Sequence, residues 1–149
     1  MLRQYKFGFD WYSLILFAIT MLPTFFCMAV PAQNDILRTT SITPLTDAVA
    51  SVSQVTMIFT LCVFINKNVN KISITPLIVG VIICCLLYYA GWICYYSGIT
   101  NALIIVLLTV PPCMSFVLFA VDRKNYIALI FALVFLISHL IYGVVNYIL

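Results

Sequence analysis

Residues Tyr126–Leu149 read YIALIFALVFLISHLIYGVVNYIL and contain no Asp, Glu, Lys or Arg. A helix needs roughly 20 mostly apolar residues, at about 1.5 Å per residue, to cross about 30 Å of hydrocarbon, so this stretch is long enough to span a membrane. Four further runs of the same kind precede it, at 11–30, 45–65, 76–96 and 102–121. Together they predict an all-α fold, a polytopic transmembrane bundle of five helices that forms a single transmembrane domain over residues 1–149.

The composition agrees with a membrane protein. Of the 149 residues, 65% are hydrophobic and 7% are charged, whereas soluble domains average about 45–50% apolar and about 25% charged residues. This balance predicts the lipid bilayer as the main partner. It disfavours a water-soluble enzyme, a disordered chain and a nucleic-acid-binding module.

Basic residues predict the orientation, because Lys and Arg in short loops are retained on the cytoplasmic side. Six of them fall on one side of the predicted helices: Arg3, Lys6, Lys67, Lys71, Arg123 and Lys124. Arg38 is alone on the other side. We therefore expect a cytoplasmic N-terminus, an outside C-terminus and an outer loop at 31–43. The net charge of +3 follows from this asymmetry and does not indicate an acidic partner.

The outer loop carries charged and capping residues. Asn34 is suited to cap a short helical turn in which Asp35 and Arg38, three residues apart, share one face. The loop is then either a lid folded over the bundle or an ordinary solvated connector.

Prolines interrupt two of the predicted helices near the bilayer midplane, at Pro23 and at Pro111–Pro112. A proline inside a helix removes a backbone hydrogen bond and clashes one turn back, so we expect both helices to bend or break. Such helices either line a cavity or only adjust the shape of the bundle.

Polar side chains form a stripe on the second and fifth helices. One antiparallel register would align three pairs: Asp47 with Asn146, Ser51 with Tyr142, and Gln54 with His139. Ala128 and Ala132 continue the stripe, and small residues let helices approach closely. The stripe serves either packing alone or a functional site, because ionisable groups inside a membrane often mark one.

The third helix carries an aromatic face. Tyr88, Trp92 and Tyr96 recur at four-residue spacing. Turned inward, this face would form an apolar pocket with Gln54 and His139. Turned outward, it would be an interfacial belt, which we expect for Tyr95, Tyr96 and Tyr147 near the outer ends of their helices.

No catalytic or metal-binding pattern is found in the sequence. The six cysteines all fall within predicted helices, form no CxxC and do not alternate with histidine, so they are predicted to pack as small apolar residues. A hydrolase would need a serine, paired acids or a metal cluster placed for catalysis. We therefore predict a protein that is not an enzyme and carries no cofactor or metal.

Several short motifs resemble an uncharacterised family of short multispan membrane proteins of Gram-positive bacteria. They are Phe7-Gly-Phe-Asp10, Leu22-Pro23, Pro31-Ala-Gln-Asn-Asp-Ile-Leu-Arg38, Thr43-Pro44, Asp47, Ser51-Val-Ser-Gln-Val55 and Met57. The resemblance covers about the first half of the chain. It implies the bacterial plasma membrane and no particular activity.

The leading hypothesis is that the protein binds, and in an extended form transports, a small partly apolar ligand or lipid in an outward-opening pocket between helices. Arg38 and Asp47 would set the charge at the mouth, and Tyr88 and Trp92 would stack on the ligand. The remaining predicted site residues are Ser51, Gln54, His139, Tyr142 and Asn146, of which Gln54 and His139 would anchor the ligand and His139 would respond to protons. The alternative is a non-catalytic accessory or immunity protein that binds a membrane-protein partner or a second copy of itself.

Overall fold

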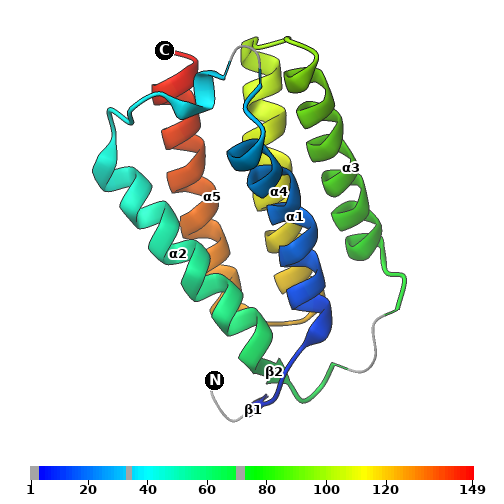
Figure 1. Cartoon of the computed structure of the whole chain (residues 1–149). Helices are drawn as coiled ribbons and strands as arrows, with labels where there is room; N and C mark the ends of the chain where they lie inside the picture. The colour runs from blue at the N-terminus through cyan, green and yellow to red at the C-terminus, as the bar shows by residue number, and fades with distance from the viewer. Residues whose placement is uncertain (1–3, 33–34, 70–72) are drawn as a thin grey trace.

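A computed structural model describes residues 4–32, 35–69 and 73–149. Its elements in chain order are β1 (Tyr5–Phe7), α1 (Trp11–Ala29), the short 3-10 helix η2 (Ile36–Arg38), α2 (Pro44–Val63), β2 (Phe64–Asn66), α3 (Pro76–Tyr96), α4 (Ala102–Asp122) and α5 (Tyr126–Tyr147). The five α-helices are each long and apolar enough to cross a membrane. The predicted five-helix bundle is confirmed, and the chain is a multispan membrane protein (Figure 1).

Capping side chains set where the helices begin. The N-cap residues Asp10, Thr75, Asn101 and Asn125 each accept a hydrogen bond from a backbone N–H in the first turn of the helix that follows. These bonds satisfy donors that a helix start leaves unpaired. These four helices begin at the residues where the sequence predicts them to begin, and α2, which has no such side-chain cap, begins one residue before its predicted span.

Helix α4 lies at the centre of the bundle. Of its most apolar stretch, 61% is buried, compared with between 22% and 33% for the other four helices. Helices α3 and α5 pack along α4, and α2 packs along α5. Ala128 and Ala132 on α5 are fully buried, as predicted for small residues at a close helix contact.

A two-stranded antiparallel sheet closes one end of the bundle, which we call the sheet end. It pairs β1 with β2, Tyr5 lying opposite Asn66 and Phe7 opposite Phe64. The sequence does not predict this sheet, because the apolar run at 45–65 places 64–65 in the second helix. The opposite end, called the loop end, carries residues 35–43 and the C-terminal residue (Figure 1).

The described basic residues keep the predicted asymmetry between the two ends. Lys6, Lys67, Arg123 and Lys124 belong to the sheet end and Arg38 to the loop end. Arg3 and Lys71 lie outside the described residues. The orientation of the bundle in the membrane stays a prediction.

The α4–α5 turn is held by the sheet and by the start of α1. Arg123 forms an ion pair with the buried Asp10, at 3.2 Å between Nε and Oδ2. The Lys124 carbonyl accepts hydrogen bonds from the Asn66 side chain at 3.0 Å and from the Tyr5 hydroxyl at 3.3 Å. Asn125 donates to the carbonyls of Thr60 and Phe64. Side chains from distant parts of the sequence thus lock the sheet end.

Neither proline-containing helix breaks at its proline: α1 continues past Pro23, and α4 past Pro111 and Pro112. Pro23 has no N–H to offer to the carbonyl of Ile19, four residues earlier. The Tyr89 hydroxyl of α3 donates to that carbonyl instead, at 2.8 Å. A neighbouring helix therefore satisfies the group that the proline leaves free, which lets α1 continue.

Replacing Tyr89 with Phe tests whether the Tyr89 hydroxyl takes the place of the N–H that Pro23 lacks. We expect Tyr89→Phe to lower the free energy of unfolding in bicelles by about 1–3 kcal/mol, because the Ile19 carbonyl loses its donor. In a Pro23→Ala background the backbone N–H of residue 23 supplies the bond, so the same change is expected to cost little. An equal loss in both backgrounds would contradict the assignment.

Candidate functional site

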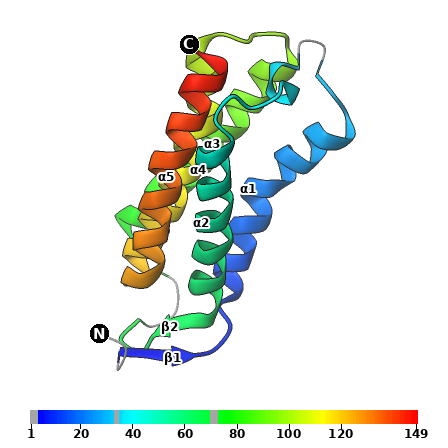
Figure 2. The same cartoon turned by 90° about the vertical axis from the view of Figure 1, so that its left-hand side faces the viewer.

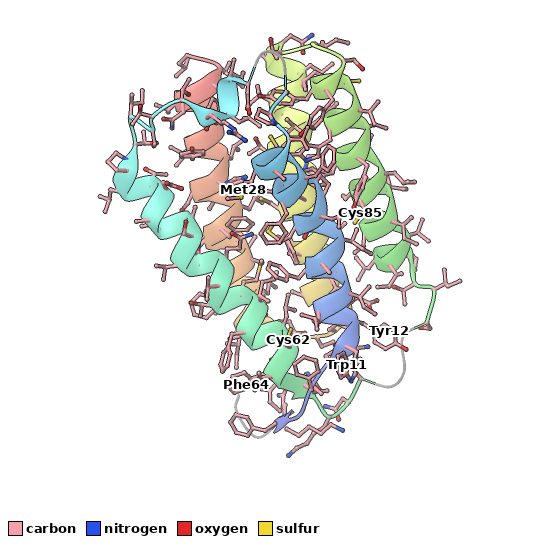
Figure 3. All side chains as sticks on the ribbon, in the orientation of Figure 1. Trp11, Tyr12, Met28, Cys62, Phe64 and Cys85 are labelled. Carbon is pink, nitrogen blue, oxygen red and sulfur yellow. The ribbon has the colours of Figure 1, made fainter. Side chains whose placement is uncertain are left out.

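A cavity of about 330 Å³, partly open to the surface, lies in the loop-end half of the bundle. All five helices and the loop residues Asp35, Leu37 and Arg38 contribute to its lining. Met28, labelled in Figure 3, lines it from the last turn of α1. Its volume lies at the lower end of the range of about 300–1,000 Å³ that is usual for small-molecule sites.

The cavity brings together most of the predicted site residues. Six of the nine line it: Arg38, Gln54, Tyr88, Trp92, His139 and Tyr142. Asp47, Ser51 and Asn146 are not among its lining residues. The polar stripe therefore lies partly in the cavity and partly outside it.

The deep part of the cavity is apolar. Cys113 and Phe116 of α4 and Phe135 of α5 line it and are buried. Gly143 allows α5 to approach α4 closely here, because a Cβ atom at this position would lie 2.9 Å from Oγ1 of Thr109. An apolar pocket with few polar groups is the usual form of a small-molecule site.

Two polar side chains in the cavity have only weak partners. The Gln54 amide nitrogen lies 3.8 Å from the sulfur of Met21, and a thioether is a poor acceptor. The His139 ring stacks between Phe135 and Tyr142, with ring centroids 5.1 Å and 6.1 Å away. Within the described residues its imidazole makes no hydrogen bond. Both side chains can therefore form hydrogen bonds with a molecule inside the cavity.

The aromatic face of α3 turns inward at three positions. Tyr88, Trp92 and Tyr95 are buried, and the Trp92 ring lies nearly perpendicular to those of Tyr88 and Tyr95. The prediction that Tyr95 belongs to an interfacial belt is wrong. Its hydroxyl donates to Asp35 at 2.9 Å, which holds it beneath the loop. Tyr147 is likewise drawn inward, since its hydroxyl donates to the Leu37 carbonyl at 3.3 Å.

The loop covers the cavity, as in the lid interpretation. Arg38 binds Asp35 at 2.9 Å, and its guanidinium also donates to the carbonyls of Cys27 and Met28 at the end of α1. The carboxylate that faces Arg38 is therefore Asp35, not Asp47. Asn34, the predicted cap of this turn, lies outside the described residues.

The predicted pairing of α2 with α5 is wrong in register. The two helices are neighbours, but Asn146 donates to the Thr43 hydroxyl at 2.6 Å and accepts from the Ile42 N–H at 2.7 Å. Asn146 thus lies opposite Thr43, one helical turn before Asp47. Asp47 and Ser51 are exposed on α2. The register differs from the prediction because Asn146 accepts a hydrogen bond from the Ile42 N–H in the loop before α2.

Several lining residues were not predicted. Met21, Thr24, Cys27 and Met28 belong to α1, and Thr109, Gly143 and Tyr147 belong to α4 and α5. The α1 residues follow a spacing of three or four residues and share one face of the helix. That spacing was the available signal, but it gave no contrast in a helix that is apolar all round.

No family model, no characterised protein and no solved structure matches this chain.

Loosening the loop should expose Cys27, which is buried beneath it. We expect Arg38→Ala to remove the two bonds to the end of α1 and to raise the labelling rate of Cys27 by a bulky water-soluble maleimide roughly tenfold. Peptide mass spectrometry resolves each cysteine. Cys62 and Cys113 serve as internal controls, and a parallel rise at both would indicate general unfolding instead of an opened lid.

Proposed function

We propose that the protein binds a small, mainly apolar molecule in the cavity beneath the loop. The observation that carries this proposal is a covered cavity of about 330 Å³ in which Gln54 and His139 have no strong partner among the described residues. Both side chains are partly buried in a mainly apolar lining, so a ligand or water can complete their hydrogen bonding. The apolar floor favours a ligand that is mostly hydrocarbon.

Binding is better supported than transport. At the sheet end, the α4–α5 turn is held by the Asp10–Arg123 ion pair and by Asn66 and Asn125. A path through the bundle would require all of these contacts to open. At the loop end, fewer elements would have to move to admit a ligand.

We further propose the plasma membrane of a bacterium as its location, with the loop end outside. The asymmetry of basic residues supports this orientation. The resemblance of the motifs in the first half of the chain supports the bacterial membrane. The cavity would then lie in the outer half of the bilayer.

Native mass spectrometry of protein released gently from its own membrane tests the proposal. We expect wild type to carry an additional small mass and the Gln54→Leu/His139→Leu variant to lose it, because both polar partners are gone. Ser51→Leu is the matched control, since it makes a similar change on α2 at an exposed position outside the cavity.

Two results would contradict binding in the cavity. One is an empty spectrum for every variant, and the other is an equal bound mass in the double variant and in wild type. Circular dichroism on each sample confirms that a lost mass does not reflect a lost fold.

A second candidate function, binding a membrane-protein partner, is favoured by one feature of α2. Asp47 and Ser51, one turn apart, are exposed on the same face of this helix. Polar residues of membrane helices usually face other helices or water. Loss of a co-purifying protein in Ser51→Leu, with the small mass retained, would support this candidate.

A further inference from the structure

The indole N–H of Trp92 is a buried donor without an acceptor. Among the described residues it is the buried side-chain polar atom that lacks a hydrogen-bond partner, and Trp92 itself is only 7% exposed. The nearby Tyr88 interacts with the indole, but not with the geometry of a hydrogen bond, and its hydroxyl is paired with Thr24 at 3.1 Å. Trp92 lines the cavity, as do Tyr88 and Thr24 beside it, so the indole stands at the wall of the proposed site.

An indole N–H can only donate, so whatever satisfies it must supply an acceptor. Leaving such a group unpaired in a buried place is unfavourable, and native structures seldom do so without a water, an ion or a ligand. The occupant of the cavity should therefore carry an oxygen or another acceptor that can reach Trp92.

The charges around the cavity favour an uncharged occupant. Arg38 is the one Lys or Arg among the described lining residues, and it is already bound to Asp35 and to two carbonyls. Asp35 in turn also accepts from Tyr95. An ionised ligand would enter an apolar space with no uncommitted Lys or Arg to balance it, which is costly.

Trp92 also separates the cavity from the lipid-facing surface. It forms part of a shallow apolar groove between α1 and α3, together with Leu22, Phe26, Tyr89 and Ile93. One residue thus borders both the cavity and a surface that acyl chains would cover. A molecule that dissolves in the bilayer can approach the site from this side.

We propose that the cavity takes an uncharged, mainly apolar molecule bearing an oxygen acceptor, such as an ester, ketone or ether, and that the Trp92 N–H donates to this oxygen. The inference rests on the proposed function, because it names the chemical class of the molecule that the cavity would bind. Specificity within this class comes from a neutral donor and not from charge.

Three probes of similar length separate the possibilities in lipid nanodiscs: methyl nonanoate, which carries an uncharged acceptor, decane, which has none, and nonanesulfonate, which is always ionised. Affinities are compared per mole fraction of probe in the bilayer, from the rise in unfolding temperature. We expect methyl nonanoate to bind about five- to tenfold more tightly than decane, the effect of one net hydrogen bond, and nonanesulfonate to bind most weakly.

Two single substitutions show whether Trp92 is responsible. Trp11→Phe leaves Trp92 as the only tryptophan, so its isotope-labelled indole gives one NMR signal, which methyl nonanoate should move downfield and decane should not. Trp92→Phe keeps an aromatic ring but removes the N–H, so in this variant methyl nonanoate should bind no more tightly than decane. Trp11→Phe should retain the preference.

The outcomes distinguish this inference from the proposed function. Equal binding of ester and decane, tightest binding of nonanesulfonate, or an unmoved indole signal would overturn the inference while leaving a cavity that binds apolar molecules. An indole signal already shifted before any probe is added, and unaffected by every probe, would assign the acceptor to water and also overturn it. Absence of binding by all three probes would overturn both.

Discussion

Backbone carbonyls that lipid cannot hydrate have to find donors within the chain, and this constraint organises the whole molecule. At Pro23 and near the ends of α1 and α2, side chains from other elements supply these donors. The pairs are Tyr89 with Ile19, Arg38 with Cys27 and Met28, Tyr96 with Val30, and Asn125 with Thr60 and Phe64. Because most of these pairs join elements far apart in sequence, satisfying the backbone locally also fixes how the helices are arranged.

The positions of the hydrogen bonds that hold α1 explain why a cavity forms. Near the sheet end, α1 is joined to α2 by the Ser13 hydroxyl, which donates to the Leu61 carbonyl. From there the two helices diverge toward the loop end, as the views in Figures 1 and 2 agree. At that end α1 is held by Arg38 and by Tyr96 instead of by close packing against α2. A helix fixed at both ends but splayed from its neighbour leaves space over α4 and α5, and the loop covers it.

The five helices could be predicted because membrane thickness sets their length and the apolar runs show where they lie in the sequence. The small residues Ala128 and Ala132 also indicated where α5 makes a close contact. The register of α2 against α5 could not be predicted, because moving one helix along its axis by a turn keeps every residue on the same face. The deciding partner, the Ile42 N–H, lies outside both helices. The strands were also beyond prediction, since Phe64 and Ile65 continue an apolar run and three residues show no strand periodicity. For the same reason, cavity residues on the uniformly apolar α1 could not be distinguished from lipid-facing ones.

The arginines that form ion pairs in the described residues stabilise the fold of the protein itself. Arg38 holds the loop to α1 through Asp35 and two carbonyls, and Arg123 holds the α4–α5 turn to Asp10. In the proposed site, recognition would therefore depend on neutral groups. Such groups discriminate by the presence and position of an acceptor, and they add no charge that the bilayer would oppose. Trp92 fits this requirement, because its ring extends the apolar wall while its N–H offers a single directed bond.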